Sequence, residues 1–272
     1  MGQFQWLGPR MTSWGWFRFL KGREYSLSAL LGIVTLASIL PLLLLGIYGL
    51  SRYVAEQHAD QLTRMSRYTK ALSNAVDREL RGYLDTAEVL AASRHLVDGD
   101  LNAFGALARD AVTKANVHVI LIDPSGQQLV NTRKPTDVAL PLTEDMESLH
   151  QVLNTDKGAV SDLFVGAVSN ELLFVVRVPV DVSGKVAYVL SLEPRANVIR
   201  DVVQQTYLPE GWFAAVIDGN GRLIARSFRH EEFYGKEASP EFLSRLVKPH
   251  GVIESTDLEG RTVLTNYHHS ER

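Results

Sequence analysis

Two arginines stand in stretches of the sequence that are otherwise typical of β-strands. Arg177 interrupts the apolar run 173–180, and Arg133 ends the run 127–133. A charge on a buried strand is costly unless it is paired or bound by a ligand. The guanidinium group is a planar fork of N–H donors that matches a carboxylate. The sequence therefore predicts a site for a small anion, an organic acid or an amino acid, held by one or both arginines.

Polar and aromatic residues on the neighbouring predicted strands complete this candidate site. The candidate ligand-binding residues are Asn131, Arg133, Asp162, Phe164, Arg177 and Tyr188. Two alternatives need no ligand: Arg177 faces solvent on the alternating side of its strand, or it pairs with Asp162.

Motifs for metals, cofactors and catalysis are weak. The Asp-x-x-Gly sequences at Asp123 and Asp218 lack the further oxygen ligands of an EF-hand loop. The sequence 219–221 precedes no helix, so it is no dinucleotide fingerprint, and both stretches are predicted hairpin turns. The cluster 230–232 lacks the spacing of a helical zinc motif. His268 and His269 with Glu271 form a weak metal candidate, and both clusters are better interpreted as polar surface residues. We expect no catalytic residue, no metal and no cofactor.

The two predicted turns belong to a repeated pattern. Each is flanked by apolar runs, within 122–130 and again within 217–225. The repeat predicts two related α+β modules in tandem, at 51–193 and 194–272, each built on an antiparallel sheet.

The periodicity of the first module predicts a long helix followed by a sheet. An amphipathic helix from residue 51 to about residue 95 carries apolar residues at spacings of three and four. Most of this apolar stripe is expected to pack on the helix's own domain, and its membrane-proximal turns are expected to form a parallel homodimer. The remaining predicted elements are a helix at 101–114, a hairpin at 117–133, a helix at 144–154 with Thr143 as its N-cap, and strands at 159–165, 172–181 and 185–193.

The second module shows a shorter pattern. Its predicted elements are a helix at 194–206, strands at 212–218 and 222–226, a helix at 240–248 with Ser239 as its N-cap, and a hairpin at 252–268. This order lacks at least one closing strand that the first module has.

An uncharged, apolar segment at 27–50 precedes both modules. It exceeds the roughly 20 residues of helix that a bilayer needs. The alternative is a cleaved signal peptide, whose apolar core is about 7–15 residues and precedes a small-x-small site. Because no convincing site of this kind follows, we expect an uncleaved transmembrane helix.

Flanking charge predicts the orientation of this helix. Basic residues precede it, at Arg10, Arg18, Lys21 and Arg23, among aromatic residues typical of a membrane interface, at Trp14, Trp16, Phe17 and Phe19. Residues 1–26 are therefore expected in the cytoplasm and residues from about 51 onward outside it. Met1 and Met11 are alternative start residues. A net charge of −3 argues against a nucleic-acid partner, and the absence of cysteine excludes disulfides and thiolate metal sites.

With these elements the chain resembles the double Cache (PDC-type, PAS-like) sensor domains of bacterial transmembrane receptors, in particular those of sensor histidine kinases. The likeness covers about residues 27–272 and is carried by the apolar segment, the long helix, 119–133, 161–164, 186–192 and 208–218. The aromatic, Arg and late Asp set of the amine- and amino-acid-binding members is not evident here, which argues against an amino acid, so an organic anion is the expected ligand and an amino acid the alternative.

The resemblance implies a ligand-sensing part of a two-component receptor in the bacterial inner membrane, with its modules in the periplasm. It also implies that a further strand, a second membrane helix and a cytoplasmic effector follow. No phospho-acceptor box or nucleotide-binding motif precedes Arg272, so no enzyme is expected within these residues. The alternatives are the sensor of a chemoreceptor or diguanylate cyclase, and a single-pass anchored binding or scaffold protein.

Overall fold

The computed structural model describes residues 26–270 except residues 116, 137 and 196. Residues 1–25 of the predicted cytoplasmic segment, with its basic and aromatic residues and both alternative start residues, lie outside the described residues. The chain divides into two compact units, residues 1–60 and 61–272.

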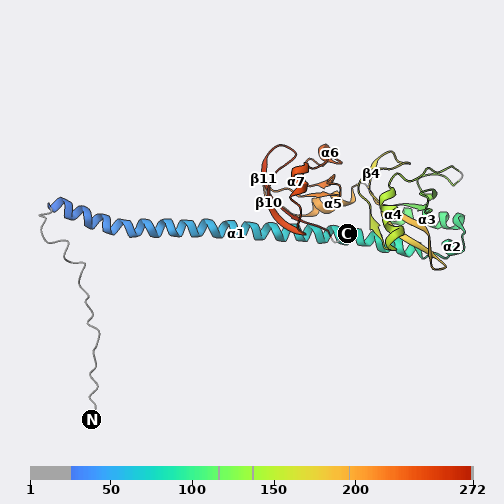
Figure 1. Ribbon diagram of the computed structural model, residues 1–272, viewed down its shortest axis with the longest axis horizontal. Helices are drawn as coiled ribbons and strands as arrows, with labels where there is room; N and C mark the ends of the chain where they lie inside the picture. The colour runs from blue at the N-terminus through green and yellow to red at the C-terminus, as the bar shows by residue number, and fades with distance from the viewer. Residues whose placement is uncertain (1–25, 116, 137, 196, 271–272) are drawn as a thin grey trace, which may run out of the picture. The chain divides into compact units, whose positions relative to one another are not determined.

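The predicted membrane segment lies in helix α1 (Leu27–Ala91), drawn in blue to cyan in Figure 1. Its window Leu31–Val54 is long and apolar enough to cross a membrane, and none of that window is buried. Pro41 lies inside the helix.

The first module contains a five-stranded antiparallel sheet. Its elements are α2 (Arg94–Val97), α3 (Leu101–Ala115), β1 (His118–Ile122), β2 (Gln128–Asn131), α4 (Met146–Thr155), β3 (Ala159–Val160), β4 (Phe164–Val165), β5 (Leu172–Leu173), β6 (Val176–Val182) and β7 (Lys185–Glu193). The strand order is β2-β1-β7-β6-β3. β7 has the predicted bounds, and the turn before it is a tight one in which Ser183 and Gly184 both have positive φ.

The predicted strands 159–165 and 172–181 are each divided in two. Ser161 N donates to the Val175 carbonyl at 2.9 Å, and Val175 N donates to Ser161 Oγ at 2.9 Å. Beyond this point the chain leaves the sheet, and β4 and β5 pair with each other as a separate hairpin.

Helices cover both faces of the five-stranded sheet. The apolar stripe of α1, residues of α3 and one face of the sheet belong to one main core, which also includes residues of the second module. Its members include Leu72, Val76, Leu80, Leu84, Phe104, Ala108, Val119, Leu121, Leu190, Leu192, Val198 and Ile199. On the opposite face, Leu149 and Val152 of α4 pack with Ile122 and Val189. The stripe of α1 between residues 72 and 90 therefore serves its own domain, as expected.

Helix α4 begins later than predicted. Its N-cap is Asp145, whose Oδ1 accepts a hydrogen bond from Ser148 N at 3.1 Å, and not Thr143. A carboxylate caps well because it also faces the positive end of the helix dipole. The hydroxyl of Thr143 instead accepts a hydrogen bond from Arg177.

The second module, drawn in orange to red in Figure 1, has smaller sheets. Its elements are α5 (Val198–Gln205), β8 (Ala215–Ile217), β9 (Leu223–Arg226), α6 (His230–Phe233), α7 (Pro240–Ser244), β10 (His250–Thr256) and β11 (Thr262–His268). β8 pairs with β9 and β10 with β11, each as a two-stranded sheet. Ser239 caps α7 as predicted, although the helix ends at Ser244 and not at residue 248.

A buried arginine joins the two hairpins of the second module. Arg226 is 2% exposed and lies between the rings of Phe213 and Phe233, with its guanidinium carbon 4.6 and 4.5 Å from their centres. Its Nη2 donates to Glu259, in the turn of β10–β11, at 2.6 Å. A stacked, paired guanidinium of this kind combines cation–π attraction with a charge-assisted hydrogen bond.

The last strand also contacts the long helix. Thr69 Oγ1 donates to the carbonyl of Asn266 at 3.5 Å, and Ser73 Oγ lies 3.3 Å from His268 Nδ1. Ser270 donates to the carboxylate of Asp77 one helical turn further on.

Truncation of the central strand tests this core. We expect Leu190→Ala to lower the free energy of unfolding by about 2–5 kcal/mol, because Leu190 is fully buried against the helices. Urea denaturation of the detergent-solubilised chain, followed by circular dichroism, measures the change. The control is Val89→Ala, at a position 75% exposed on α1, where a change within about 0.5 kcal/mol is expected. Equal effects of the two substitutions would contradict this description of the core.

Candidate ligand-binding site

A row of side chains crosses the sheet on the face that also packs on α4. Strand register places Asn131 opposite Ile120, Ile120 opposite Ser191, and Ser191 opposite Arg177. Because residues directly opposite each other on adjacent strands have their side chains on the same face, all four lie on one face. Asn131 and Arg177, which were predicted as site residues from separate parts of the sequence, thus lie at the two ends of one row.

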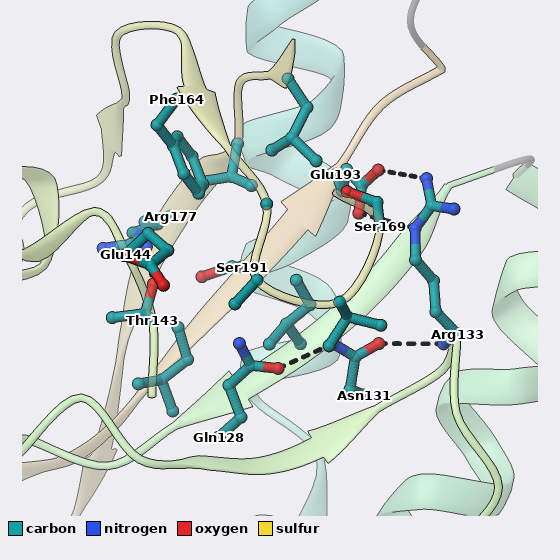
Figure 2. Close-up of a pocket in the computed structure, with 17 residues that line it drawn as sticks. Gln128, Asn131, Arg133, Thr143, Glu144, Phe164, Ser169, Arg177, Ser191 and Glu193 are labelled. Atoms are coloured by element: carbon teal, nitrogen blue, oxygen red, sulfur yellow. Dashed lines mark hydrogen bonds and ion pairs between the residues drawn. The ribbon is translucent and has the colours of Figure 1, made fainter. Parts of the chain in front are cut away.

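The hairpin at residues 163–173, here called the roof hairpin, covers this row. Together they line the sheet pocket, formed by Ile120, Ile122, Gln128, Asn131, Arg133, Thr143, Glu144, Phe164, Gly166, Ala167, Val168, Ser169, Leu173, Val175, Arg177, Ser191 and Glu193. Figure 2 shows Arg177 with Thr143 and Glu144 at one end, Arg133 with Glu193 and Ser169 at the other, and Ser191 between them. The cavity itself measures about 20 Å³, which is room for about one water molecule.

Arg177 is the buried cation of this pocket, with 1% of its surface exposed. Its Nη1 donates to the Asp145 carbonyl at 2.8 Å, and its Nη2 donates to Thr143 Oγ1 at 3.0 Å. The Asp145 carboxylate lies 3.6 Å away. Burial lowers the pKa of Arg177 to about 10, against the opposing charge of Asp145, so the side chain stays charged at neutral pH. Arg177 therefore neither faces solvent nor pairs with Asp162; it holds the segment before α4.

Arg133 stands at the other end of the pocket and pairs with Glu193. Its Nε donates to Glu193 Oε2 at 3.0 Å, and its Nη2 donates to Glu193 Oε1 (Figure 2). Glu193 is 4% exposed, whereas the Arg133 side chain is 28% exposed. The fork-to-fork pair raises the pKa of Arg133 and leaves a buried carboxylate that depends on one partner.

A second, larger space begins on the far side of this pair. This end cavity measures about 230 Å³ and is lined by His118, Arg133, Glu171, Leu172, Leu173, Glu193, Pro194 and Arg195. It shares Arg133, Glu193 and Leu173 with the sheet pocket. The ion pair therefore forms part of the wall of both spaces.

Three polar atoms at these cavities are buried without a hydrogen-bond partner among the described residues. They are Ser191 Oγ and Arg177 Nε in the sheet pocket and His118 Nδ1 at the end cavity. Buried polar groups are nearly always hydrogen-bonded in folded proteins, so each of these atoms can accept a water molecule or a ligand group as its partner.

The structure brings four of the six predicted residues to the sheet pocket: Asn131, Arg133, Phe164 and Arg177. Asn131 supports the others, since its Oδ1 accepts a hydrogen bond from Arg133 N at 2.9 Å and its Nδ2 donates to Gln128 Oε1 at 2.7 Å. Phe164 belongs to the roof hairpin.

Asp162 and Tyr188 do not line either cavity. The Asp162 carboxylate accepts hydrogen bonds from Gly219 N at 2.7 Å and Asn220 Nδ2 at 2.8 Å, so it contacts the second module. Burial, together with nearby Asp218, raises its pKa. Tyr188 alternates with Val189 and Ser191 along β7, so its side chain points to the other face of the sheet. There it packs against the core that includes α1 and α3.

Sequence reasoning missed the acidic and hydroxyl residues of the site. Glu193 and Ser191 alternate with Tyr188 on β7, and His118 begins β1 opposite Glu193. A correct choice of the sheet face would have found the first two, because the period of a strand is two. Asp145 and Thr143 precede α4 and carried no signal beyond helix capping.

No protein-family model matches the chain, and no curated protein matches it. Solved structures do match. The extracellular domain of rpHK1S-Z16, a protein assigned as a histidine kinase, is 15% identical, with a TM-score of 0.61 over 79% of this chain and 91% of that one. The ligand-binding domain of the Campylobacter jejuni chemoreceptor Tlp3, solved with L-valine, is 14% identical, with a TM-score of 0.55 over 77% and 88%.

A third match is the ligand-binding domain of the Pseudomonas aeruginosa amino-acid chemoreceptor PctC, solved with GABA. It is 18% identical, with a TM-score of 0.55 over 72% of this chain and 88% of that one. The chain therefore has the fold of extracytoplasmic sensory domains, in agreement with the α+β Cache-like architecture expected from the sequence.

His118 makes the stability of this region pH-dependent. Burial, together with the nearby Arg133 guanidinium, lowers the pKa of His118. Below the ordinary histidine value of about 6.5 the unfolded chain then binds more protons than the folded chain, so stability falls as the pH drops. We expect His118→Gln to reduce the loss of urea-denaturation midpoint between pH 7.5 and pH 5. His150→Gln, on the exposed side of α4, is the control and should leave the pH profile unchanged; the same profile for all three chains would refute the assignment.

Proposed function

We propose that the chain is the ligand-sensing, extracytoplasmic part of a membrane-bound signalling receptor and that it binds an amino acid at the Arg133–Glu193 pair. The observation that carries the proposal is this ion pair of a partly exposed arginine and a buried carboxylate, which lines two cavities beside the roof hairpin. The likeness to sensory domains solved with L-valine and GABA supports it.

The charges at the pair favour a zwitterion over a simple anion. A ligand carboxylate that took Arg133 alone would leave Glu193 buried and unpaired, which is strongly unfavourable. An amino acid brings an ammonium group as well, so it can separate the pair while each buried charge keeps an opposite partner. This argument selects the amino acid from the two ligand classes that the sequence left open.

The surroundings provide space on one side of the pair and an apolar lining on the other. The end cavity of about 230 Å³ is more than ten times the roughly 10–15 Å³ that holds one water molecule. The sheet pocket has an apolar floor and roof at Ile120, Ile122, Phe164 and Leu173, which suits the side chain of an apolar amino acid. Ser191 Oγ and Arg177 Nε are further polar groups that such a ligand can reach.

The remaining parts of the proposal concern the membrane and the output. The apolar window of α1 would anchor the chain in the bacterial inner membrane, with the modules in the periplasm and a parallel homodimer formed by the membrane-proximal turns. Ligand binding would bias two arrangements of the helices that lead to the membrane. The match to a domain assigned to a histidine kinase supports a two-component kinase as the output.

Calorimetry on the detergent-solubilised chain tests the ligand class. We expect L-valine, L-isoleucine or GABA to bind, and isovalerate and succinate, which lack an amine, to bind at least tenfold more weakly. Arg133→Ala should weaken amino-acid binding at least tenfold, because the ligand carboxylate loses its guanidinium partner and with it a charge-assisted hydrogen bond. Glu193→Gln should weaken binding of the amino acid while the amine-free acids gain.

The matched control is Arg200→Ala, which removes a partly buried arginine that pairs with Glu231 in the second module and lines neither cavity, so affinity should be unchanged. Tight binding of succinate, reduced by Arg133→Ala but not by Glu193→Gln, would overturn the zwitterion in favour of an anion. No binding by any amino acid would reject the proposed function.

The output is tested on the receptor in native membranes. We expect labelled ATP to leave acid-labile, base-stable phosphate on the receptor, as histidine phosphorylation does, at a level that the amino acid changes. Because the same fold occurs in chemoreceptors, a receptor that is never labelled but changes swimming behaviour would favour a chemotaxis output.

A further inference from the structure

The roof hairpin is held at both ends by the second module. At its start, Leu163 N donates to Asp218 Oδ2 at 2.9 Å, and Arg222 Nη1 donates to the Leu163 carbonyl at 3.4 Å. At its end, the hydroxyl of Tyr234 donates to the Leu172 carbonyl at 2.9 Å. None of these three second-module residues lines either cavity.

The two modules also fit closely at these points. Asp162, next to Leu163, accepts hydrogen bonds from Gly219 N and Asn220 Nδ2 in the turn between β8 and β9. A carboxylate of each module therefore binds main-chain N–H groups of the other. A Cβ atom on Gly235 would overlap the side chain of Leu172. The second module therefore leaves little room for the roof hairpin to move toward it.

The residues beside these anchor points are the ones that cover the ligand pocket. Phe164 follows Leu163, Leu173 follows Leu172, and the two pair with each other across the hairpin. Both line the sheet pocket, whose cavity of about 20 Å³ is too small for any amino-acid side chain beyond a methyl group. A larger side chain that enters the sheet pocket must displace Phe164 and Leu173, and with them the main chain that the second module holds.

We propose that Tyr234 and Asp218 are positioning residues that set the affinity and size selectivity of the pocket in the neighbouring module. The proposal rests on the proposed amino-acid site. The second module holds the roof hairpin down, so part of the binding free energy of a large ligand is spent on breaking these contacts. By linkage, a ligand that lifts the roof hairpin loosens the contact between the modules by the same amount.

The first test is Tyr234→Phe, which removes one hydroxyl and keeps the ring. Loss of a net hydrogen bond of about 0.5–1.5 kcal/mol predicts that L-isoleucine binds about twofold to tenfold more tightly to the variant than to the wild type. Glycine, which has no side chain to place under the roof hairpin, should bind both chains equally. A gain of affinity that depends on ligand size is not expected from general structural damage. The matched control is Tyr207→Phe, at a position in the second module that is 84% exposed, where no change is expected.

Asp218→Ala tests the other end of the hairpin. It removes the acceptor of Leu163 N and should give the same size-dependent gain, provided that its circular dichroism spectrum matches that of the wild type. Unchanged or weaker isoleucine binding in both variants would overturn the proposal.

Hydrogen exchange on the ligand-free chain separates this proposal from the proposed function. We expect faster exchange at residues 163–173 in Tyr234→Phe and Asp218→Ala than in the wild type, whether or not any amino acid binds. If no ligand binds and exchange still rises, the proposed function fails while the second module's hold on the hairpin stands. If exchange at residues 163–173 is unchanged in both variants, that hold is refuted, even if amino acids bind the wild type.

Discussion

Arg177 and Glu193 are buried on one face of the same sheet, and each has a partner within hydrogen-bond distance. Burying a charge without such a partner costs several kcal/mol of folding free energy, so separation of either charge from its partner is strongly unfavourable. Arg177 fixes Thr143 and Asp145, and thereby the place where α4 begins. Glu193 fixes Arg133 at the end of β2. The positions of the two sides of the pocket therefore follow from the requirement that each buried charge keeps a hydrogen-bond partner.

The opposite face of the sheet has no such requirement. There Leu190, Leu192 and Val119 pack on α1 and α3, and the core continues into α5 of the second module. One sheet thus combines a face packed wholly with apolar residues and a face on which the apolar contacts with α4 lie beside buried charges. In the proposed function, the ligand binds at the charged part of the second face and leaves the first one unchanged.

The sequence allowed most of the strands and turns to be predicted, because their signals are local. The bounds of β7 were correct since Ser183 and Gly184 form a tight turn ahead of an apolar run, and Ser239 was recognised as a cap. Thr143 was the wrong cap because Asp145 competes for the same helix and a tertiary contact with Arg177 occupies the threonine hydroxyl.

The candidate site was harder to predict, because it depends on strand register and on contacts between distant segments. Arg133, Arg177, Asn131 and Phe164 were placed at one pocket by their types and positions on strands. Tyr188 lies on β7 but points to the face opposite to Ser191 and the pocket. Because side chains alternate along a strand, choosing a position one residue away selects the wrong face. Asp162 accepts a hydrogen bond from Gly219, which is distant in the sequence, and no local sequence pattern predicts such a partner.

The contacts between β11 and α1 have a mechanical consequence. Thr69, Ser73 and Asp77 stand about one helical turn apart and hold Asn266, His268 and Ser270 in the same order. When α1 slides along its own axis, all three contacts are loaded together in shear, and they resist as a group. When α1 tilts away, they open one after another and resist only singly. In this part of the molecule, an axial displacement of α1 therefore moves the hairpin β10–β11 with it, whereas a tilt of α1 is transmitted to that hairpin less completely.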